Sequence, residues 1–437
     1  MAAKTKTHRR QFLRSAARLA AGAVAVPYFV PGSALGKDGA TVPSDRIVMG
    51  SIATGGRGSA LLRGWLGLSD SHVVAVCDVK KPARDRAKAR VDQRYGGSGC
   101  TSYTDFRELL ARDDIDAVTV ASPDHWHVPL AAAAVRAGKD VYCEKPLGLS
   151  VQQGTELRRL VRQYGAVFQF GTQERSAWST HLACTIVRNQ WIGELKKVTV
   201  SSRFSRASGN YPTEPVPDWL DYDLWLGPAP WAPYTPNRVL NNHWFHISDY
   251  ALGFIAGCGI HTVDMAMWGM GTDRTGPVEV EGIGEFPPDG LCNCATGWDV
   301  NLTFANGVVM NFTDGKRNPL GVRFEGTDGW VFVKEKHLGG TVTASSNSLL
   351  KKKPGPNDVH LRSSSNHGQD FLEAIKNRSD PVAPIEGAVR GDAICQLSDA
   401  AMRLGRKLHW DPDAERFVND SEADRMLVRP MRDPWRL

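Results

Sequence analysis

The chain has 437 residues, of which 42% are hydrophobic and 23% charged, and its formal net charge is +6 at pH 7. This length and composition are typical of a globular protein with two domains and disfavour a small disulfide-stapled fold. All of the net charge comes from six basic residues near the N-terminus, so we expect no nucleic-acid partner. These residues are Lys4, Lys6, Arg9, Arg10, Arg14 and Arg18.

The N-terminal segment has the features of a twin-arginine export signal. Residues 7–15 read THRRQFLRS, and an alanine-rich apolar run follows over residues 19–30. That run contains Pro27 and is shorter than the roughly 20 apolar residues of a membrane span. Small residues at 34–36 indicate a cleavage site, so we predict removal of residues 1–36, with retention as a lipid-free anchor as the alternative. The twin-arginine machinery exports folded proteins, which predicts a periplasmic location.

A nucleotide-binding fingerprint follows the first predicted strand. Residues 46–52 form an apolar run, ATGGRG follows as a turn, and SALLRGWL begins a helix. In the GxGxxG pattern the second glycine lets the backbone approach a pyrophosphate, and the third lets the helix meet the strand. The first position holds Ala53, which costs on the order of 1 kcal/mol over glycine if the turn requires a positive φ. The predicted cofactor-binding residues here are Thr54, Gly55, Gly56, Arg57 and Gly58.

A carboxylate follows the second predicted strand. Asp78 comes directly after the apolar run over residues 72–77. A carboxylate at this place accepts both ribose hydroxyls of NAD and repels the 2′-phosphate of NADP. We therefore predict NAD as the cofactor, with NADP possible because Lys80 and Lys81 follow closely. The alternative role for Asp78 is the N-cap of the next helix.

Strands and helices continue to alternate beyond Asp78. The pattern predicts helices over 105–111 and 128–138, and strands over 117–121 and 140–143. Such alternation predicts a parallel, doubly wound sheet that binds its ligands at the carboxyl ends of the strands. The loop SPDHWH and the tripeptide EKP follow two of these ends, and Lys145 is placed where a nicotinamide ring would lie. The predicted cofactor-binding residues here are Ser122, Pro123, His125, His127, Glu144 and Lys145.

The motifs together resemble those of the Gfo/Idh/MocA oxidoreductases. The resemblance rests on ATGGRG, VCDV, ASPDHWH, AGKDVYCEKPL, GTQERS and GIHTVDMAMWG, in this order. The tail segments DYDLWLGPAP, NHGQDFLEAIKNRSDPVAP, LGRKLHWDPDAERFVND and RPMRDPW are similar to the exported, sugar-processing branch. The resemblance implies a Rossmann domain followed by an α/β domain with an open, largely antiparallel sheet. It also implies NAD(P), redox chemistry at a hydroxyl of a sugar or polyol, and a homo-oligomer paired through the face of the second sheet.

We therefore predict a signal peptide over 1–36, a dinucleotide-binding domain over 37–168 and a substrate-binding domain over 169–437. The evidence from the residues of the second half is thinner. Strand-like runs such as VVMNFTDG and GWVFVKE alternate there with turn-rich loops, and helical patterns cover residues 370–376 and 387–404.

Oxidation of an alcohol requires a base within hydrogen-bond reach of the hydroxyl, opposite the cofactor. Lys145 is the first candidate, and an ordinary surface lysine is the alternative. His261 and Asp264 are the second candidates, since on a helix their i,i+3 spacing lets one orient the other or both grip a sugar; a core histidine capped by an aspartate is the alternative. The resemblance implies an aspartate four residues before the histidine, and this position holds Gly257, which removes one carboxylate from the expected relay.

The predicted substrate contacts are Trp126, Gln173, Arg175 and His261. Trp126 follows the fourth strand, where the resemblance places residues around the nicotinamide and the substrate. Arg175 could equally pair with a structural carboxylate. Among the 13 tryptophans, one or two are expected to stack on the apolar face of a sugar, while most pack in the core or a lid.

The eight cysteines are scattered without CxxC pairs, which favours small core residues. Cys292 and Cys294 taken with His125 and His127 match no zinc spacing, so we expect no metal site. No internal repeat occurs, and no further segment is long and apolar enough to span a membrane.

Three functions fit these features. The leading one is an NAD(P)-dependent oxidoreductase that acts on a sugar or glycoside with a tightly held cofactor. The second is a glycoside-cleaving enzyme, in which oxidation of a ring carbon acidifies the neighbouring proton, elimination expels the aglycone and reduction restores NAD. The third is a non-catalytic carbohydrate-binding protein that retains the fold. Export of a folded chain fits a cofactor that is loaded in the cytoplasm and carried out.

Overall fold

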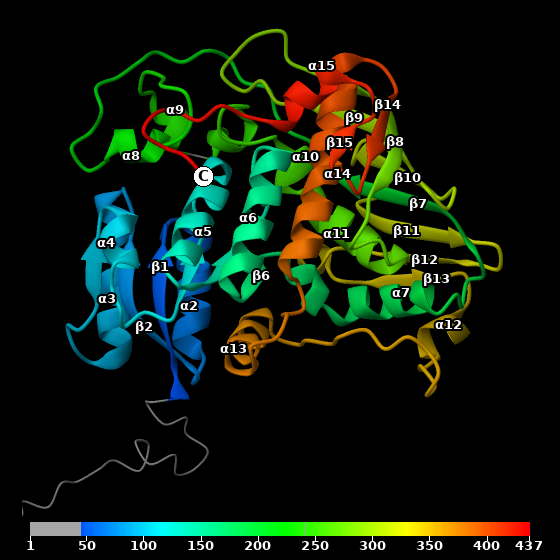
Figure 1. The fold of residues 1–437 in the computed structure, drawn as a ribbon, viewed down its shortest axis with the longest axis horizontal. Coiled ribbons are helices and arrows are strands. Elements are labelled where there is room, and N and C mark those ends of the chain that lie inside the picture. The colour runs from blue at the N-terminus through cyan, green and yellow to red at the C-terminus, as the bar shows by residue number, and fades with distance from the viewer. Residues whose placement is uncertain (1–44, 241) are drawn as a thin grey trace, which may run out of the picture. The chain divides into compact units, whose positions relative to one another are not determined.

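The computed structural model describes residues 45–240 and 242–437, and the chain from Ile47 to Leu437 forms one compact unit. This unit contains a six-stranded and a nine-stranded sheet (Figure 1). The predicted export signal lies outside the described residues. Among the helices of the described ranges, none combines the length and apolarity that a membrane crossing requires.

The six-stranded sheet is parallel and has the order β3-β2-β1-β4-β5-β6. Its strands are β1 (Ile47–Ile52), β2 (Ser71–Cys77), β3 (Thr101–Tyr103), β4 (Ala117–Val120), β5 (Asp140–Cys143) and β6 (Phe168–Phe170). The connecting helices are α2 (Gly56–Gly67), α3 (Lys81–Tyr95), α4 (Phe106–Leu110), α5 (His127–Arg136) and α6 (Val151–Tyr164). The strand order reverses between β1 and β4, the place where doubly wound sheets bind ligands. The predicted Rossmann topology is confirmed.

The strands of this sheet form where short apolar runs are buried on both faces. Every residue of β4 and β5 is buried, as a central parallel strand requires. Helix ends follow local signals. Helix α6 begins after Ser150, whose hydroxyl accepts a hydrogen bond from the amide of Gln153, and it ends at Gly165 in the left-handed region.

The nine-stranded sheet is antiparallel except for one parallel pair, β7 with β10. Its strands are β7 (Leu195–Ser202), β8 (Pro277–Glu285), β9 (Gly297–Phe304), β10 (Val309–Asp314), β11 (Gly321–Gly326), β12 (Trp330–Val333), β13 (Val342–Ala344), β14 (Leu408–Asp411) and β15 (Arg416–Phe417). This is the open, largely antiparallel sheet that the family resemblance implied.

Among the helices of the second half, α7 (Trp178–Arg188), α11 (Gly259–Met270) and α14 (Ile385–Leu404) pack on this sheet. The remaining helices are α8 (Tyr222–Leu226), α9 (Pro236–Val239), α10 (Phe254–Gly257), α12 (Asn347–Lys351), α13 (His367–Asn377) and α15 (Ser421–Asp424). Short 3₁₀ helices are η4 (Asp124–Trp126), η5 (Gln173–Ser176), η6 (His243–His246), η7 (Lys336–Leu338) and η8 (Arg425–Leu427). A single hydrophobic core continues from Val118 of the first sheet to Phe312 of the second. All eight cysteines are free thiols, and all except Cys258 are buried, as predicted.

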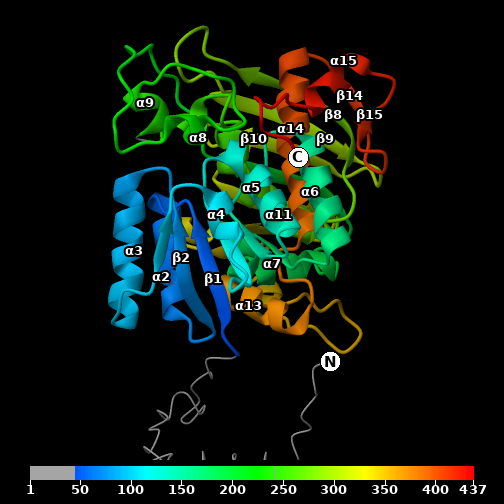
Figure 2. The ribbon, with the colours of Figure 1, turned by 60° about the vertical axis from the view of Figure 1, so that its left-hand side comes forward.

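A separate apolar cluster organises the stretch that we call the cover segment, residues 217–240 and 242–250. Its buried residues include Tyr222, Trp225 and Tyr250. Backbone hydrogen bonds tie it to the loop after β2: the amide of Lys81 donates to Trp219, and the amide of Asp221 donates to Val79. Figures 1 and 2 both place α8 and α9 above the edge of the parallel sheet at which β1 and β2 end.

Candidate functional site

The turn between β1 and α2 has the shape that a dinucleotide-binding turn requires. Ala53 has φ +63°, so the left-handed conformation is present although this residue carries a Cβ. A Cβ on Gly58 would lie 1.9 Å from the carbonyl oxygen of Ala53, whereas a Cβ on Gly55 would meet nothing within 4 Å. Gly58 therefore permits the close packing of helix on strand, and Gly55 leaves open space for a ligand.

The first turn of α2 faces a cavity of about 630 Å³, which Gly55, Gly56 and Arg57 help to line. The helix begins without a side-chain cap, so its first amide groups have no partner within the helix. Free amides and the helix dipole favour an anion at this point. The residues present fit the pyrophosphate of a dinucleotide.

Asp78 lines the same cavity and joins two of its loops. Its Oδ2 accepts a hydrogen bond from the amide of Thr54 at 2.7 Å, and its Oδ1 accepts one from the amide of Lys80 at 2.8 Å. Burial raises the pKa of Asp78, and the two amide hydrogen bonds act in the opposite direction. The N-cap of α3 is Lys80, so Asp78 does not take the alternative capping role. The carboxylate is thus positioned at the end of β2, where a ribose would lie.

The two lysines that left NADP possible each bind another group. Lys80 Nζ donates to the carbonyl oxygen of Val239 in the cover segment, at 3.0 Å. Lys81 Nζ pairs with Asp85 on the solvent side of α3, at 2.6 Å. Lys80 thus remains in the cavity lining near Asp78 with its ammonium group bonded to the cover segment, whereas Lys81 does not line the cavity.

Trp126 connects the parallel sheet to the cover segment. Its Nε1 donates to the carbonyl oxygen of Leu224 at 3.0 Å, and its ring packs edge-on against Phe106 and Trp435. A Cβ on Gly227 of the cover segment would lie 2.0 Å from the Trp126 ring. The side chain is 5% exposed and lines the cavity, with its indole packed under the cover segment. The substrate contact predicted for Trp126 stays a prediction.

The cover segment closes one side of the cavity. The residues that it contributes to the lining are Leu224, Trp225, Val239, Leu240, Asn242, Trp244 and Phe245. They are mostly apolar and far in sequence from the fingerprint. A dinucleotide in this cavity would be enclosed between the parallel sheet and the cover segment.

The two histidines of SPDHWH differ in role. His125 does not line the cavity; its Nε2 lies 3.0 Å from the carbonyl oxygen of Trp225, and burial lowers its pKa to about 4. His127 lines the cavity, with Nδ1 2.6 Å from the carbonyl oxygen of Pro146 and Nε2 2.9 Å from that of Ser122. His127 therefore holds the two cavity loops together, and the predicted cofactor contact of His125 is replaced by a contact with the cover segment.

Glu144 and Arg57 form an ion pair beside the turn between β1 and α2. Arg57 Nε lies 2.7 Å from Glu144 Oε1, and the Glu144 side chain is 4% exposed. Gln173 Nε2 donates to the same oxygen at 3.1 Å and to the hydroxyl of Tyr142 at 3.2 Å. Gln173, predicted to bind substrate, thus orients Glu144.

Lys145 lies where the cavity meets the second half of the chain. Its side chain lines the cavity, and its Nζ donates to the carbonyl oxygen of Gly257. A Cβ on Gly257 would make only ordinary contacts, 3.6 Å from Phe245 and from Phe254. The position at which a relay carboxylate was expected therefore has space for a side chain, but it supplies a neutral backbone acceptor to the lysine.

His261 and Asp264 of α11 do not act on each other. The Nδ1 atom of His261 is buried and has no hydrogen-bond partner among the described residues. Burial, and next the charge of Lys145, place the pKa of His261 well below its usual value, so the ring is neutral. Asp264 instead binds Arg175, with Oδ1 2.7 Å from Nη2 and Oδ2 2.9 Å from Nε, and accepts a hydrogen bond from Thr172.

The Arg175–Asp264 pair corrects two predictions. The side chains are 3% and 1% exposed, so neither group is available to grip a sugar. A buried carboxylate requires a paired charge and hydrogen bonds. The guanidinium of Arg175 supplies both to Asp264, whereas the neutral imidazole of His261 does not. The alternative role that the sequence left open for Arg175, pairing with a structural carboxylate, is the one observed.

Sequence reasoning missed Asp124, which lies between two residues that it did select. Asp124 is 1% exposed, lines the cavity, and has no hydrogen-bond partner for either carboxyl oxygen among the described residues. Burial raises its pKa well above the usual value, which favours the neutral acid. A neutral carboxyl group can both donate to and accept from a ligand, and its place in the loop after β4 was the available signal.

A second group was also missed. Glu174, Glu335 and His337 gather close to Lys145 and His261, with one ligand-type atom of each within 4.8 Å of the others. The His337 ring centroid lies 6.4 Å from that of His261. These residues come from distant parts of the chain and belong to no motif, so the sequence held no signal for them.

Two family models match the chain. Residues 48–172 match the one described as the oxidoreductase family NAD-binding Rossmann fold, and residues 190–437 match the one described as the oxidoreductase family C-terminal alpha/beta domain. Together they cover both sheets and the cavity between the Rossmann strands and the cover segment.

Individual proteins are similar over parts of the chain. A glycosyl hydrolase family 109 protein of Saccharopolyspora erythraea is 38% identical over 117 residues, 26% of this chain and 25% of the relative. The alpha-N-acetylgalactosaminidase of Shewanella oneidensis is 30% identical over 164 residues, 33% of this chain and 35% of the relative. The matches thus span about a third of these relatives or less. The aldose-aldose oxidoreductase of Caulobacter crescentus shares the fold, with a TM-score of 0.62 and 18% identity over 83% of this chain and 99% of that one.

Proposed function

Because the chain belongs to the Gfo/Idh/MocA family of oxidoreductases, we propose that it oxidises or reduces a CH–OH group of a sugar or glycoside with NAD retained in the cavity. The observation that carries this proposal is the place of Lys145. It lies at the carboxyl end of β5, lines the dinucleotide cavity and reaches α10 of the second half of the chain. A substrate hydroxyl near Nζ would lie between the cofactor and the buried polar groups of α11.

The residues of the cavity fit NAD part by part. The open space beside Gly55 and the uncapped start of α2 suit the pyrophosphate, and Asp78 suits the ribose hydroxyls. We propose NAD over NADP, since Asp78 repels a 2′-phosphate and Lys80 is bound to Val239. When bound, NAD supplies the acceptor or donor of the hydride.

Lys145 is proposed to move the hydroxyl proton. Its Nζ is bonded to a neutral carbonyl, so it can exchange this partner for a substrate oxygen without breaking an ion pair. His261 is neutral, and its Nδ1 has no hydrogen-bond partner in the part of the chain that the structure describes, so it can accept a hydrogen bond from a second hydroxyl or donate one, according to its tautomer. Two polar groups that face one sugar ring would orient it against the cofactor.

The cover segment supports slow release of NAD. Two backbone hydrogen bonds, the Lys80 to Val239 bond and the buried Trp126 ring join it to the parallel sheet. Opening the cavity requires these contacts to break together. A retained cofactor suits a protein that binds NAD in the cytoplasm, folds and is exported by the twin-arginine route to the periplasm, and we propose this location.

A second function is favoured by the similarity to proteins named glycosyl hydrolase family 109. In it, hydride transfer from a ring carbon to NAD would acidify the neighbouring proton, and elimination would expel the aglycone. Water would then add to the resulting double bond, and return of the hydride would restore NAD to its first state. Such a cycle needs no exchange of cofactor and therefore fits an enclosed cavity.

One experiment tests and separates these functions. The protein, purified with its cofactor, is incubated with a panel of aryl glycosides and free sugars, and NADH absorbance and aglycone release are followed together. Stoichiometric NADH without aglycone supports the oxidoreductase, and many turnovers of aglycone without net NADH support the glycoside-cleaving cycle. A protein that binds no NAD, or that changes neither signal with any sugar of the panel, contradicts both.

A further inference from the structure

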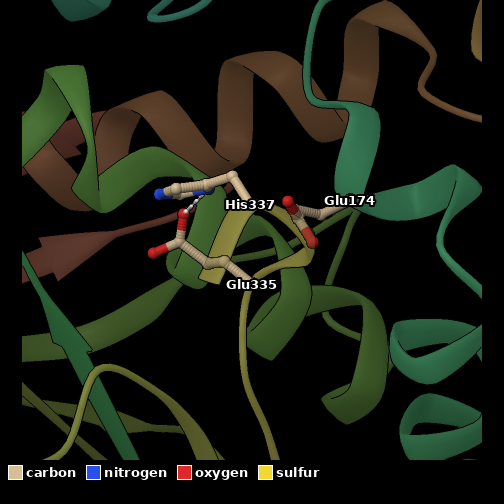
Figure 3. Close-up of side chains that lie close together, drawn as sticks. All are labelled: Glu174, Glu335 and His337. Atoms are coloured by element: carbon tan, nitrogen blue, oxygen red, sulfur yellow. Dashed lines mark ion pairs between the residues drawn. The ribbon is translucent and has the colours of Figure 1, made fainter. Parts of the chain in front are cut away.

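Three side chains of metal-ligand type converge from two distant parts of the chain. Glu174 lies in η5, directly after β6, whereas Glu335 and His337 lie in the loop between β12 and β13. Figure 3 shows the two carboxylates and the imidazole ring gathered in one place. The amide of Lys336 donates to Glu174 Oε2 at 2.9 Å, and this bond holds the loop of Glu335 and His337 against η5.

Glu335 has one buried carboxyl oxygen that lacks a hydrogen-bond partner among the described residues. Its side chain is 1% exposed. Its Oε2 lies 3.2 Å from His337 Nδ1, yet the pair lacks hydrogen-bond geometry, so Oε2 has no such partner among the described residues. Leaving a buried carboxylate oxygen in this state is costly unless a cation or a proton occupies the site.

Among the described residues, the neighbouring cationic side chains do not form an ion pair that would offset the cost of burying the Glu335 carboxylate. Lys145 and Arg203 are near enough to stabilise the Glu335 anion, but within the described ranges neither forms an ion pair with Glu335 or Glu174. Two carboxyl groups therefore share a buried site whose nearest cations lie outside it.

The spacing of Glu335 and His337 suits a metal ion. Two ligands about 2.1 Å from one ion and roughly 90–109° apart lie about 3.0–3.4 Å from each other. The 3.2 Å between Glu335 Oε2 and His337 Nδ1 falls within this range.

We propose that Glu174, Glu335 and His337 bind one divalent transition-metal ion of the class of Zn²⁺ or Mn²⁺. Two carboxylates and an imidazole, without a thiolate, are ligands that these ions accept. Three protein ligands leave coordination positions open, and His337 is 46% exposed, so small molecules can reach the site. The spacing of cysteines and histidines, from which we expected no metal site, contains no signal for this cluster. Glu174 is separated from Glu335 by 161 residues in the sequence.

The ring centroids of His337 and His261 lie 6.4 Å apart, so a molecule bound at the open positions would lie near His261. We assign them to two neighbouring hydroxyl oxygens of the substrate, an assignment that rests on the proposed function. The metal would then orient the sugar, a role that the carboxylate expected at position 257 cannot take because Gly257 stands there.

The test uses the full-length exported protein with any affinity tag removed. Metal content is measured by mass spectrometry, and the chelator-treated protein is titrated with Zn²⁺ and with Mn²⁺ by calorimetry in the absence of sugar. We expect one equivalent per chain for at least one of these ions. Glu335→Gln should weaken its binding at least about tenfold, and Glu194→Gln, at an exposed carboxylate paired with Lys196, should leave it unchanged.

A second variant keeps the test decisive. If Glu335→Gln fails to fold, His337→Ala, at a half-exposed position, takes its place with the same expected loss. Binding of neither ion by the wild type, or equal binding by the wild type and these variants, would overturn the proposal. Because binding is measured without substrate, a protein that binds metal but turns over no sugar contradicts the proposed function and leaves the metal site standing. Unchanged sugar affinity after metal removal overturns the assignment of the open positions.

Discussion

A Gly58→Ala substitution tests whether the nucleotide-binding turn depends on the contact between α2 and β1. The added Cβ would lie 1.9 Å from the carbonyl oxygen and 2.9 Å from the carbonyl carbon of Ala53. Real Cβ atoms keep at least about 3.0 Å from other atoms, and both obstructing atoms belong to the backbone. The turn must therefore move by about 1 Å, and overpacking of this kind costs about 1–3 kcal/mol.

This cost predicts a measurable change in melting temperature. An unfolding entropy of roughly 2.1 cal/mol/K per residue gives about 0.8 kcal/mol/K for the unit from Ile47 to Leu437. The expected decrease in Tm of the NAD-free protein is therefore about 1–4 °C by scanning calorimetry. NAD affinity, measured by titration calorimetry, should fall at least about tenfold, since Ala53 belongs to the turn that approaches the pyrophosphate.

Two alanine variants serve as controls. A Cβ at Gly55 or at Gly64 meets nothing within 4 Å, but only Gly55 lines the cavity. Gly55→Ala should keep the Tm of the NAD-free protein and lose NAD affinity. Gly64→Ala, on the exposed face of α2, should keep the affinity and leave Tm equal or slightly higher, as alanine favours a helix by up to about 1 kcal/mol. A Gly58→Ala protein with wild-type Tm and wild-type NAD affinity would refute the steric reasoning.

Three further predictions follow from the site. Lys145→Met should abolish turnover while NAD binding stays within about tenfold, because the ammonium acts on the substrate oxygen in the transition state; more than half of the wild-type rate would reject this role. Asp78→Ser should weaken NAD and improve the relative binding of NADP in a fluorescence titration, because the repulsive carboxylate is removed; an unchanged preference would speak against the assignment. His125 is buried with a pKa of about 4, below the value of about 6.5 in unfolded chains, so its stabilising contribution is present above pH 6.5 and lost as pH falls toward 4. From about pH 7.5 to pH 5 the loss is about 2 kcal/mol, and His125→Asn should show a correspondingly smaller decrease in denaturant-measured stability over this interval; equal decreases would show that another group carries the acid sensitivity.

Local signals in the sequence were sufficient for the parallel sheet and the fingerprint. The strand over Asp140–Cys143 has the predicted bounds, β4 is one residue shorter than predicted at its C-terminal end, and α4 is one residue shorter at each end. These elements follow from apolar runs, caps and glycine positions that act over a few residues. The positive φ of Ala53 was anticipated for the same reason, since the turn imposes it on whichever residue stands there.

The partners of the buried polar groups could not be read from the sequence. Asp264 pairs with Arg175, Lys145 with Gly257 and Lys80 with Val239, and each partner lies at least 89 residues away. His261 and Asp264 do have i,i+3 spacing on one helix. The buried carboxylate of Asp264 nevertheless pairs with the guanidinium of Arg175, because burial requires a charged partner. Which charges are buried, and therefore which must be paired, depends on how the two sheets and the cover segment pack. For that reason only the tertiary structure showed the cavity and the cluster of Glu174, Glu335 and His337. The sequence alone predicted the Rossmann strands.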